Sequence, residues 1–370
     1  MPDVVLFETK PLRDGGQLGL VTLNAPKTLN SLSLEMIDLM LPQLIKWEDD
    51  PQVVLVLFLS EGDRAFSAGG DIQNLYHDMV QHPGGPCPYS DAFFEREYRL
   101  DYLIQTYNKP TVVWGQGIAM GGGLGVLTAC SHKIATETTR IAMPEITIGL
   151  FPDAGATYSL SRMPEHYAHF LAWTGANLNG EDARRVGLID YLINNDQQDA
   201  VIDAITSHSW VGDPATTVDQ LLNTFTQDSS GFPASQLAMH DQVISKTVNA
   251  ALASDNPVRV FLEQCEKLGG DKWLDQAVAT FKSGTPTTAA IICEQIQRGK
   301  SMTREQIFAM ELTLAVQCSR HEDFREGIRA LLIEKDNSPN WQYEMGGVPH
   351  ERIEAHFSEP WPINPLSDLN

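Results

Sequence analysis

The sequence lacks the long apolar run that would mark a membrane protein. No stretch approaches the roughly 20 consecutive apolar residues that a membrane-spanning helix needs. The segment Met1–Lys10 has neither a basic stretch followed by an apolar one nor the Arg- and Ser-rich character of a transit peptide. We therefore expect a cytoplasmic protein with no membrane partner.

Positive charge is also scarce. The chain of 370 residues has 26 Lys and Arg against 48 Asp and Glu, which gives a formal net charge of −22 at pH 7. A field of this sign repels nucleic acid and anionic lipid, so neither is expected as a partner. An anionic ligand must instead meet a local basic patch and backbone N–H donors.

Cysteine pairs and common catalytic motifs are missing as well. The five cysteines are odd in number, widely scattered and contain no Cys-x-x-Cys pair, which argues against a disulfide framework or a zinc site. There is no Gly-x-Ser-x-Gly nucleophile motif. His166 and His169 lie three residues apart without a carboxylate or cysteine partner at ligand spacing, so we expect a structural role for both. The sequence predicts no metal and no cofactor.

The first half of the chain alternates strand-like and helix-like segments. The apolar run at 53–59, between Pro51 and Gly62, is typical of a strand buried on both faces. Strands are predicted at 4–7, 18–23, 53–59 and 112–114. Helices are predicted to follow Ser33, Asp71 and Asp91, with Ser33 as an N-cap. This alternation indicates an α/β core.

Asp78–Ser90, rich in proline and glycine, is predicted to be a surface loop. The second half of the chain has a different pattern. Beyond about residue 200, amphipathic helical patterns replace strand signals, Gln227–Ser235 resembles a linker, and Thr303 with Gln306 forms a capping-box pattern. We therefore predict a core over residues 1–210 and a helical C-terminal region over residues 211–370 that completes the fold.

Two glycine-rich segments each follow a predicted strand and precede a predicted helix. They are Phe66–Asp71 (FSAGGD) and Met120–Gly125 (MGGGLG). Glycine lets backbone approach a ligand, and two helix N-termini could aim two N–H donors at one developing oxyanion. Tight turns and close helix packing would require the same residues. The dinucleotide fingerprint Gly-x-Gly-x-x-Gly does not fit, because Met120 and Val126 occupy the third glycine position in the two alignments tried.

Glu145 and Asp153 lie eight residues apart in an otherwise apolar stretch, MPEITIGLFPDAG. A carboxylate in apolar surroundings is costly unless it is paired or functional, and burial raises its pKa. Those are the conditions for acid–base or nucleophilic catalysis. Two alternatives stay open: both acids lie on a surface loop, or Asp153 caps a following helix.

A third candidate acid lies on the helix predicted after Asp91. Glu95 and Glu97 cannot share one helix face, so one of the two can point inward. The alternative is that this helix face is solvated.

Together these segments resemble the enoyl-CoA hydratase/isomerase (crotonase) superfamily in residues, order and spacing. The resemblance is carried by Asn24-Ala25-Pro26-Lys27, Asn30-Ser31-Leu32, FSAGGDI from Phe66, MGGGLGV from Met120 and MPEITIGLFPDAG from Met143. It implies a core of repeated ββα turns and an acyl-CoA substrate as partner. It also implies an oxyanion hole made by the backbone N–H groups of Gly70 and Gly122.

Within this superfamily the sequence is most similar to the 3-hydroxyisobutyryl-CoA hydrolases. Enoyl-CoA hydratases carry a glutamate three residues after the second oxyanion glycine, where this chain and the hydrolases have glycine, here Gly125. The hydrolases also share the acid pair seen here as Glu145 and Asp153, a helix that matches Glu97, and a C-terminal block like Asp323–Trp341.

The resemblance implies a role for each candidate residue. Gly70 and Gly122 would polarise a thioester carbonyl, and Glu145 would activate water or attack directly. Asp153 would orient a substrate hydroxyl group and assist proton transfer. Substrate-binding roles fall to Glu97, Lys27, Ala68 and Asp71. The implied reaction is hydrolysis of a small 3-hydroxyacyl-CoA in valine breakdown.

One departure concerns the shape of the acyl pocket. The family tends to be richer in glycine after the aspartate, where this chain has Ala154-Gly155-Ala156. Two other functions remain as alternatives, namely hydration or isomerisation of an acyl-CoA, and acyl-CoA binding without catalysis. A homo-oligomer also stays open, since the superfamily often forms trimers or hexamers but the C-terminal region could replace partner contacts.

Overall fold

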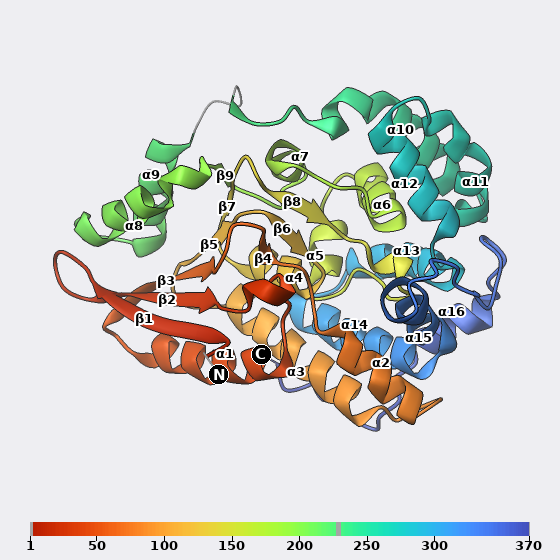
Figure 1. The fold of residues 1–370 in the computed structure, drawn as a ribbon, viewed down its shortest axis with the longest axis horizontal. Helices are drawn as coiled ribbons and strands as arrows, with labels where there is room; N and C mark the ends of the chain where they lie inside the picture. The colour runs from red at the N-terminus through yellow and green to blue at the C-terminus, as the bar shows by residue number, and fades with distance from the viewer. Residues whose placement is uncertain (1–2, 227–230, 370) are drawn as a thin grey trace. The chain divides into compact units, whose positions relative to one another are not determined.

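The structure is a computed structural model that describes residues 3–226 and 231–369 (Figure 1). The chain forms two compact units that alternate along the sequence. The first comprises the described residues of Met1–Gly70, Leu100–Ile141 and Leu178–Ser235, and the second those of Asp71–Arg99, Ala142–Asn177 and Gln236–Asn370. The predicted division into a core over residues 1–210 and a helical region over residues 211–370 assumes two contiguous segments. This division stays a prediction.

The first unit is built on a six-stranded sheet with the order β1-β2-β3-β5-β7-β9. The strands are β1 (Val5–Pro11), β2 (Gln17–Leu23), β3 (Val53–Ser60), β5 (Thr111–Gly115), β7 (His132–Ala135) and β9 (Tyr191–Leu192). β1 and β2 pair antiparallel, whereas each later neighbour pair is parallel. Because β3 and β5 are covered on both faces, they read as continuous apolar runs, as predicted.

A second, three-stranded sheet has the order β4-β6-β8. Its strands are β4 (Ala65–Ser67), β6 (Ile118–Met120) and β8 (Arg140–Ala142), and β4 and β6 are parallel. Along the chain β3 is followed by β4 and a helix, and β5 by β6 and a helix. Each pair thus sends one strand to each sheet, which confirms the predicted core of repeated ββα turns.

Helices cover the six-stranded sheet of the first unit. They are α1 (Leu34–Asp49), α4 (Gly122–Ala129), α7 (Gly180–Arg185), α8 (Gln198–Ser207) and α9 (Pro214–Phe225), with short 3-10 turns η1 (Pro26–Thr28) and η3 (Asn195–Gln197). The Ser33 side chain caps α1 as predicted. Leu57 and Trp114 from the sheet share one apolar cluster with Ile205 of α8 and Leu222 of α9. Burial of each such side chain contributes about 1.5–3 kcal/mol.

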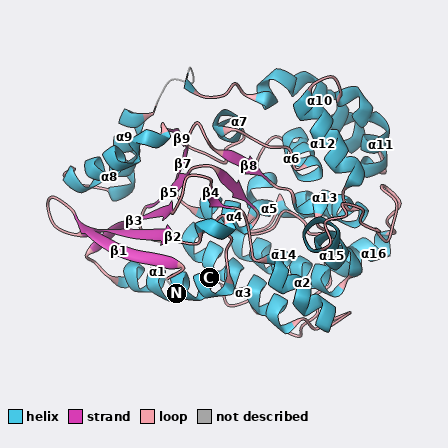
Figure 2. Ribbon diagram, in the orientation of Figure 1, coloured by secondary structure: helices cyan, strands magenta, loops and turns pink. Residues whose placement is uncertain are grey.

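The second unit is almost entirely helical (Figure 2). It contains α2 (Ile72–Gln81), α5 (Ala156–Leu160), α6 (Glu165–Thr174), α10 (Gln236–Leu252), α11 (Pro257–Gln264), α12 (Lys272–Ser283), α13 (Pro286–Gly299), α14 (Arg304–Arg320), α15 (Glu322–Ile328) and α16 (His350–His356). It also has the 3-10 turns η2 (Glu145–Thr147) and η5 (Cys265–Leu268) and the π-helical turn η6 (Arg329–Ile333). The aromatic rings of Trp173, Phe261 and Phe281 pack together in its core.

The helical C-terminal region is confirmed, since the described residues after β9 contain helices and turns only. The capping box of Thr303 and Gln306 is present at the start of α14. The linker prediction at Gln227–Ser235 falls in part on residues 227–230, which lie outside the described residues. None of the helices in the described parts of the chain has the length and hydropathy needed to cross a bilayer.

The predicted loop at Asp78–Ser90 is too long. α2 continues to Gln81, and α3 (Pro88–Gln105) begins at a proline, which is tolerated in the first turn of a helix. Asp78 is buried and accepts hydrogen bonds from the N–H and hydroxyl of Ser90, at 2.8 and 2.9 Å. The contact draws the ends of the two helices together, an effect that composition alone does not show.

Candidate active site

The two glycine-rich segments lie side by side in the first unit. Because β4 and β6 are parallel neighbours, the segments that follow them leave the same edge of the sheet. A Cβ atom on Gly123 would lie 2.4 Å from the Ser67 carbonyl oxygen, so this close approach requires glycine. A Cβ on Gly69, which has a φ of 110°, would lie 3.4 Å from the Met120 carbonyl oxygen.

Each of these segments offers a backbone N–H. Gly122 is the first residue of α4, so its N–H has no partner within the helix. The N–H of Gly70 donates no hydrogen bond to another backbone group within residues 3–226 and 231–369. Two donors on neighbouring backbone segments are the elements of an oxyanion hole. The convergence of both on a single oxygen stays a prediction.

An asparagine fixes the loop that precedes this edge. Asn30 has a φ of 54°, and its side-chain amide donates to the carbonyl oxygens of Glu61 and Ala65 at 3.0 and 3.1 Å. The N–H of Ala68 donates to the Leu29 carbonyl oxygen at 3.0 Å. Ala68 is therefore held in place by backbone contacts next to Gly70. Lys27 lies in η1 and is exposed.

Three predicted acids gather in the second unit. Glu97 of α3, Glu145 at the start of η2 and Asp153 are 2%, 5% and 7% exposed. The alternatives of a surface loop for Glu145 and Asp153, and of a solvated helix face for Glu97, are therefore wrong. Glu95, the other glutamate of this helix, faces outward and forms an ion pair with Arg99 at 3.2 Å.

Asp153 is held by a tyrosine and does not cap a helix. The Tyr98 hydroxyl donates to its Oδ2 at 2.6 Å. Helix α5 begins at Ala156 with Gly155 as its N-cap and has no side-chain cap, so the capping alternative is wrong. Burial raises the pKa of Asp153 to about 6, while the hydrogen bond from Tyr98 opposes the shift by favouring the carboxylate.

The other two acids are incompletely satisfied. Burial raises the pKa of Glu145 and of Glu97 well above the ordinary value, and the charge of Asp153 adds to both shifts. The Oε2 atom of Glu145 and the Oε1 atom of Glu97 are buried without a hydrogen-bond partner in the described structure. Buried unpaired carboxyl oxygens with raised pKa values are typical of acid–base sites.

Sequence reasoning missed the residues that shape the backbone after Asp153. Ala154 and Gly155 both have positive φ, 54° and 82°. The buried carboxylate of Glu311 on α14 accepts the N–H of Gly155 at 2.7 Å and of Thr157 at 2.9 Å. The sequence contains an indication that Glu311 is buried, because this acid lies on the apolar face of α14 that carries Ile307 and Leu314.

Gln295 of α13 supports the same turn. Its side-chain amide donates to the Pro152 carbonyl oxygen at 2.6 Å and to the Thr157 hydroxyl at 2.7 Å. Gln295 thus contacts the chain on both sides of Asp153, whereas Glu311 contacts it after Asp153 only. Asp71 does not join this arrangement: it precedes α2, and its carboxylate accepts a hydrogen bond from Asn74 at 2.7 Å.

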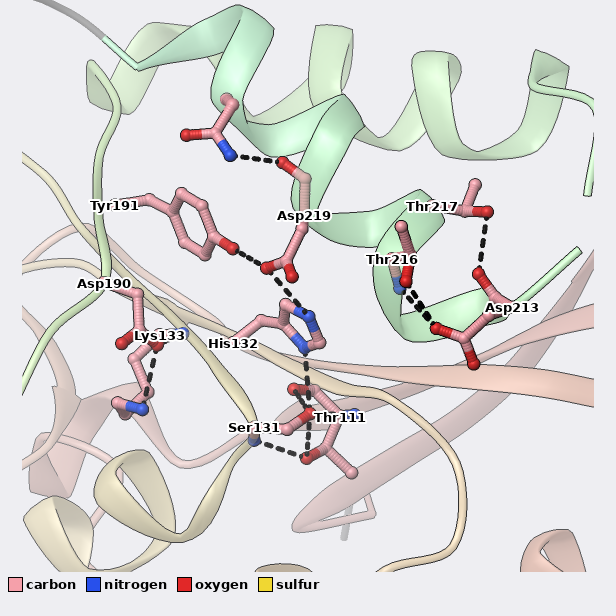
Figure 3. Close-up of polar contacts among 11 residues, drawn as sticks. Thr111, Ser131, His132, Lys133, Asp190, Tyr191, Asp213, Thr216, Thr217 and Asp219 are labelled. Carbon is pink, nitrogen blue, oxygen red and sulfur yellow. Dashed lines mark hydrogen bonds and ion pairs between the residues drawn. The ribbon is translucent and has the colours of Figure 1, made fainter.

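A Ser–His–Asp arrangement in the first unit is structural. Figure 3 shows His132 between Ser131 and Asp219, with distances of 2.8 Å from Ser131 Oγ to His132 Nδ1 and 3.4 Å from His132 Nε2 to Asp219 Oδ1. Ser131 Oγ also lies 3.0 Å from the Thr111 carbonyl oxygen, so it is part of the contact between β5 and the start of β7. Tyr191 also donates to Asp219, and the network joins α9 to the sheet.

Residues suited to holding a metal do not cluster here. Across residues 3–226 and 231–369, no group of three His, Cys, Asp or Glu side chains is arranged to hold a metal ion. The acids of the second unit can carry out proton transfer or nucleophilic attack by a carboxylate. The glycine N–H groups of the first unit can stabilise an anion.

Comparisons with known proteins agree with one family. The sequence pattern of the family described as enoyl-CoA hydratase/isomerase matches residues 18–357. The chain is 35% identical over 356 residues to a protein of Danio rerio named 3-hydroxyisobutyryl-CoA hydrolase, mitochondrial, covering 96% of this chain and 89% of the relative. The protein of the same name from Homo sapiens is 33% identical, covering 95% of this chain and 88% of the relative.

A solved structure gives the same result for the fold. The structure of a carnitinyl-CoA dehydratase from Mycobacterium thermoresistibile is similar to this chain, with a TM-score of 0.85 and 30% sequence identity over 99% of each chain.

Proposed function

Since the chain belongs to the enoyl-CoA hydratase/isomerase family, we propose that it hydrolyses 3-hydroxyisobutyryl-CoA to 3-hydroxyisobutyrate and CoA. The observation that carries the proposal is the buried Glu145, which has one carboxyl oxygen without a partner and a raised pKa. The names of the relatives at 33–35% identity support the same reaction.

In the proposed mechanism the N–H groups of Gly70 and Gly122 polarise the thioester carbonyl. Glu145 either removes a proton from the attacking water or attacks the carbonyl carbon to form a mixed anhydride that water then hydrolyses. In both routes the C–S bond breaks, a C–O bond forms, and the departing CoA sulfur gains a proton. Asp153 accepts a hydrogen bond from the 3-hydroxyl group of the substrate and assists this proton transfer, and Glu97 lines the acyl pocket.

Hydration or isomerisation is the second candidate, and it is favoured by the similarity to a carnitinyl-CoA dehydratase. Gly125 opposes it, because this buried position of α4 has no side chain to act as a second acid. Acyl-CoA binding without catalysis is opposed by the buried, incompletely hydrogen-bonded acids, because burying such groups costs free energy that a catalytic role would explain.

The cellular setting remains part of the proposal. A role in valine breakdown follows from the proposed substrate. The relatives are named mitochondrial, so a cytoplasmic location for this chain stays a prediction. A homo-oligomer also stays a prediction, as do the contact of Lys27 with the CoA part of the substrate and the substrate-binding roles of Ala68 and Asp71.

A panel of thioesters tests the proposed substrate. The release of CoA from 3-hydroxyisobutyryl-CoA, 3-hydroxypropionyl-CoA and isobutyryl-CoA is followed by thiol detection. A hydrogen bond to a charged group is worth about 1.5–3 kcal/mol, so we expect kcat/KM to fall roughly 10- to 100-fold when the 3-hydroxyl group is absent. Equal kcat/KM values for 3-hydroxyisobutyryl-CoA and isobutyryl-CoA would contradict recognition of the 3-hydroxyl group by the enzyme.

The hydrogen bond from Tyr98 to Asp153 makes a prediction about pH. The hydrogen bond favours the Asp153 carboxylate, so Tyr98→Phe should raise the pKa of Asp153 above about 6. The mechanism uses the ionised carboxylate, and the acidic limb of the kcat/KM profile should therefore move to higher pH, by about one to two units for the loss of one hydrogen bond to a charged group. Tyr158→Phe, at the surface of α5, is the matched control and should leave the limb unchanged. If the acidic limb of the kcat/KM profile does not move in Tyr98→Phe, the ionised form of Asp153 has no role in the reaction.

A further inference from the structure

A pocket of about 410 Å³ lies within the second unit, apart from the carboxylates described above. Its walls come from the ends of α2 and α14, the start of α15, and α16, elements that pack on one another (Figure 1). Three arginines line it, Arg320, Arg325 and Arg352, together with His321. The volume is in the range of small-molecule sites.

The charge of this pocket is opposite to that of the chain as a whole. The lining contains one carboxylate, Glu322, and that side chain is exposed. Arg320 pairs with Asp91 at 3.4 Å. For Arg325 and Arg352, no carboxylate lies within ion-pair distance among the residues the structure describes. Two unpaired guanidinium groups in one pocket are notable where acids outnumber bases 48 to 26.

The pocket also contains buried donors without acceptors. The Nε atoms of Arg320 and Arg352 and the Nε2 atom of His321 are solvent-inaccessible and have no hydrogen-bond partner in the described structure. Buried polar atoms are nearly always paired, so a cluster of such donors needs an explanation. An oxyanion accepts several N–H bonds at once, and arginine offers them in a fork that matches phosphate.

The arginine on α14 is held in place before any ligand binds. A Cβ atom on Gly85, which has a φ of 73°, would lie 2.5 Å from Cγ of Arg320, so the chain turn packs directly on the arginine stem. Asp91 fixes the guanidinium end. Arg352 donates to the side-chain oxygen of Gln342. Preorganised side chains lose less entropy on binding, which favours a ligand site over a set of mobile surface charges.

We propose that this pocket binds the phosphate group of a small phosphate monoester, at a site separate from that of the acyl-CoA substrate. Arg325 and Arg352 supply the uncompensated positive charge. The pocket is far larger than one phosphate ion, and the remaining volume accommodates the organic part of the ligand. Arg320 follows Glu311 by nine residues on α14, roughly 13 Å along the helix axis at 1.5 Å per residue, which separates this pocket from the catalytic carboxylates.

Inorganic phosphate is the probe for the first test, with the full-length protein. Calorimetric titration should show saturable binding of phosphate that chloride at the same ionic strength does not reproduce, and phosphate should raise the melting temperature. Arg325→Gln and Arg352→Gln should each weaken phosphate binding at least about 10-fold. Arg304→Gln is the control, because it removes the same charge from the other, exposed end of α14 and should bind phosphate like the wild type.

The binding measurement on the wild-type protein can overturn the proposal by itself, so the test does not depend on whether a variant folds. Absence of saturable phosphate binding, or equal loss of binding in Arg304→Gln and Arg325→Gln, would contradict a specific site. The second test adds CoA. Phosphate and CoA should bind independently of each other. Competition between them would assign the pocket to the phosphates of the substrate and overturn the separate site, without affecting the proposed hydrolysis.

Discussion

Replacing Glu145 by glutamine is expected to lower kcat for CoA release by at least about 100-fold, the low end of the contribution of general acid–base catalysis. The glutamine side chain has nearly the same shape but cannot remove a proton from water or form an anhydride. A loss of this size follows from either proposed role of Glu145, so the measurement tests its participation rather than the choice between base and nucleophile.

Stability should not fall in this variant. The pKa of Glu145 is raised by burial, so above the ordinary pKa of a glutamate this carboxyl group costs the folded protein free energy, and the neutral amide removes this cost. We expect a melting temperature equal to or above that of the wild type. Glu165→Gln, on the surface of α6, is the matched control and should keep full activity. Retention of most of the activity by Glu145→Gln would remove Glu145 from the mechanism.

The Asp153→Asn variant should combine poor turnover with an intact fold. We expect a fall in kcat of about 100-fold, since the amide cannot take part in proton transfer. The Tyr98 hydroxyl can still donate to the amide oxygen, and no helix cap is lost because α5 is capped without this side chain. The comparison to make is melting temperature against kcat for this one variant. If Asp153→Asn keeps a kcat near that of the wild type, Asp153 is not a catalytic acid and Glu145 alone remains in the proposal.

The same variant predicts a change in the pH dependence of stability. The pKa of Asp153 is about 6 in the folded protein and 3.8 as its ordinary value, so the folded state binds the proton more tightly. The stabilisation this gives is complete below pH 3.8 and is lost as the pH rises to about 6. Relative to Asp153→Asn, the wild type should therefore lose on the order of 3 kcal/mol between pH 4 and pH 7, at 1.36 kcal/mol per unit. Chemical unfolding of both proteins at several pH values measures this difference.

The parts of the site that could be predicted from the sequence are local. Gly122 and Gly123 stand in a short glycine-rich segment that predicts a helix start and a close backbone approach, whereas Ser67 as the group approached is known from the structure alone. Glu145 and Asp153 stood out as acids in an apolar stretch, and burial of both is confirmed. Local sequence was thus sufficient to mark these positions, but it did not identify the residues that they contact.

The missed residues act over long sequence distances. Glu311 contacts the backbone of Gly155 across 156 positions, and Tyr98 contacts Asp153 across 55. No local pattern relates such positions to each other. Strands β4, β6 and β8, with three residues each, were missed for another reason, since periodicity cannot be detected over so short a run.

The most direct test of the proposed reaction compares two rates in one protein preparation. Release of free CoA from 3-hydroxyisobutyryl-CoA is measured by thiol detection, and hydration of crotonyl-CoA by loss of its conjugated double bond. The account predicts that kcat/KM for CoA release exceeds kcat/KM for hydration, because Gly125 provides no second acid while Glu145 is buried and incompletely paired. Efficient hydration of crotonyl-CoA without thiol release from either substrate would contradict it.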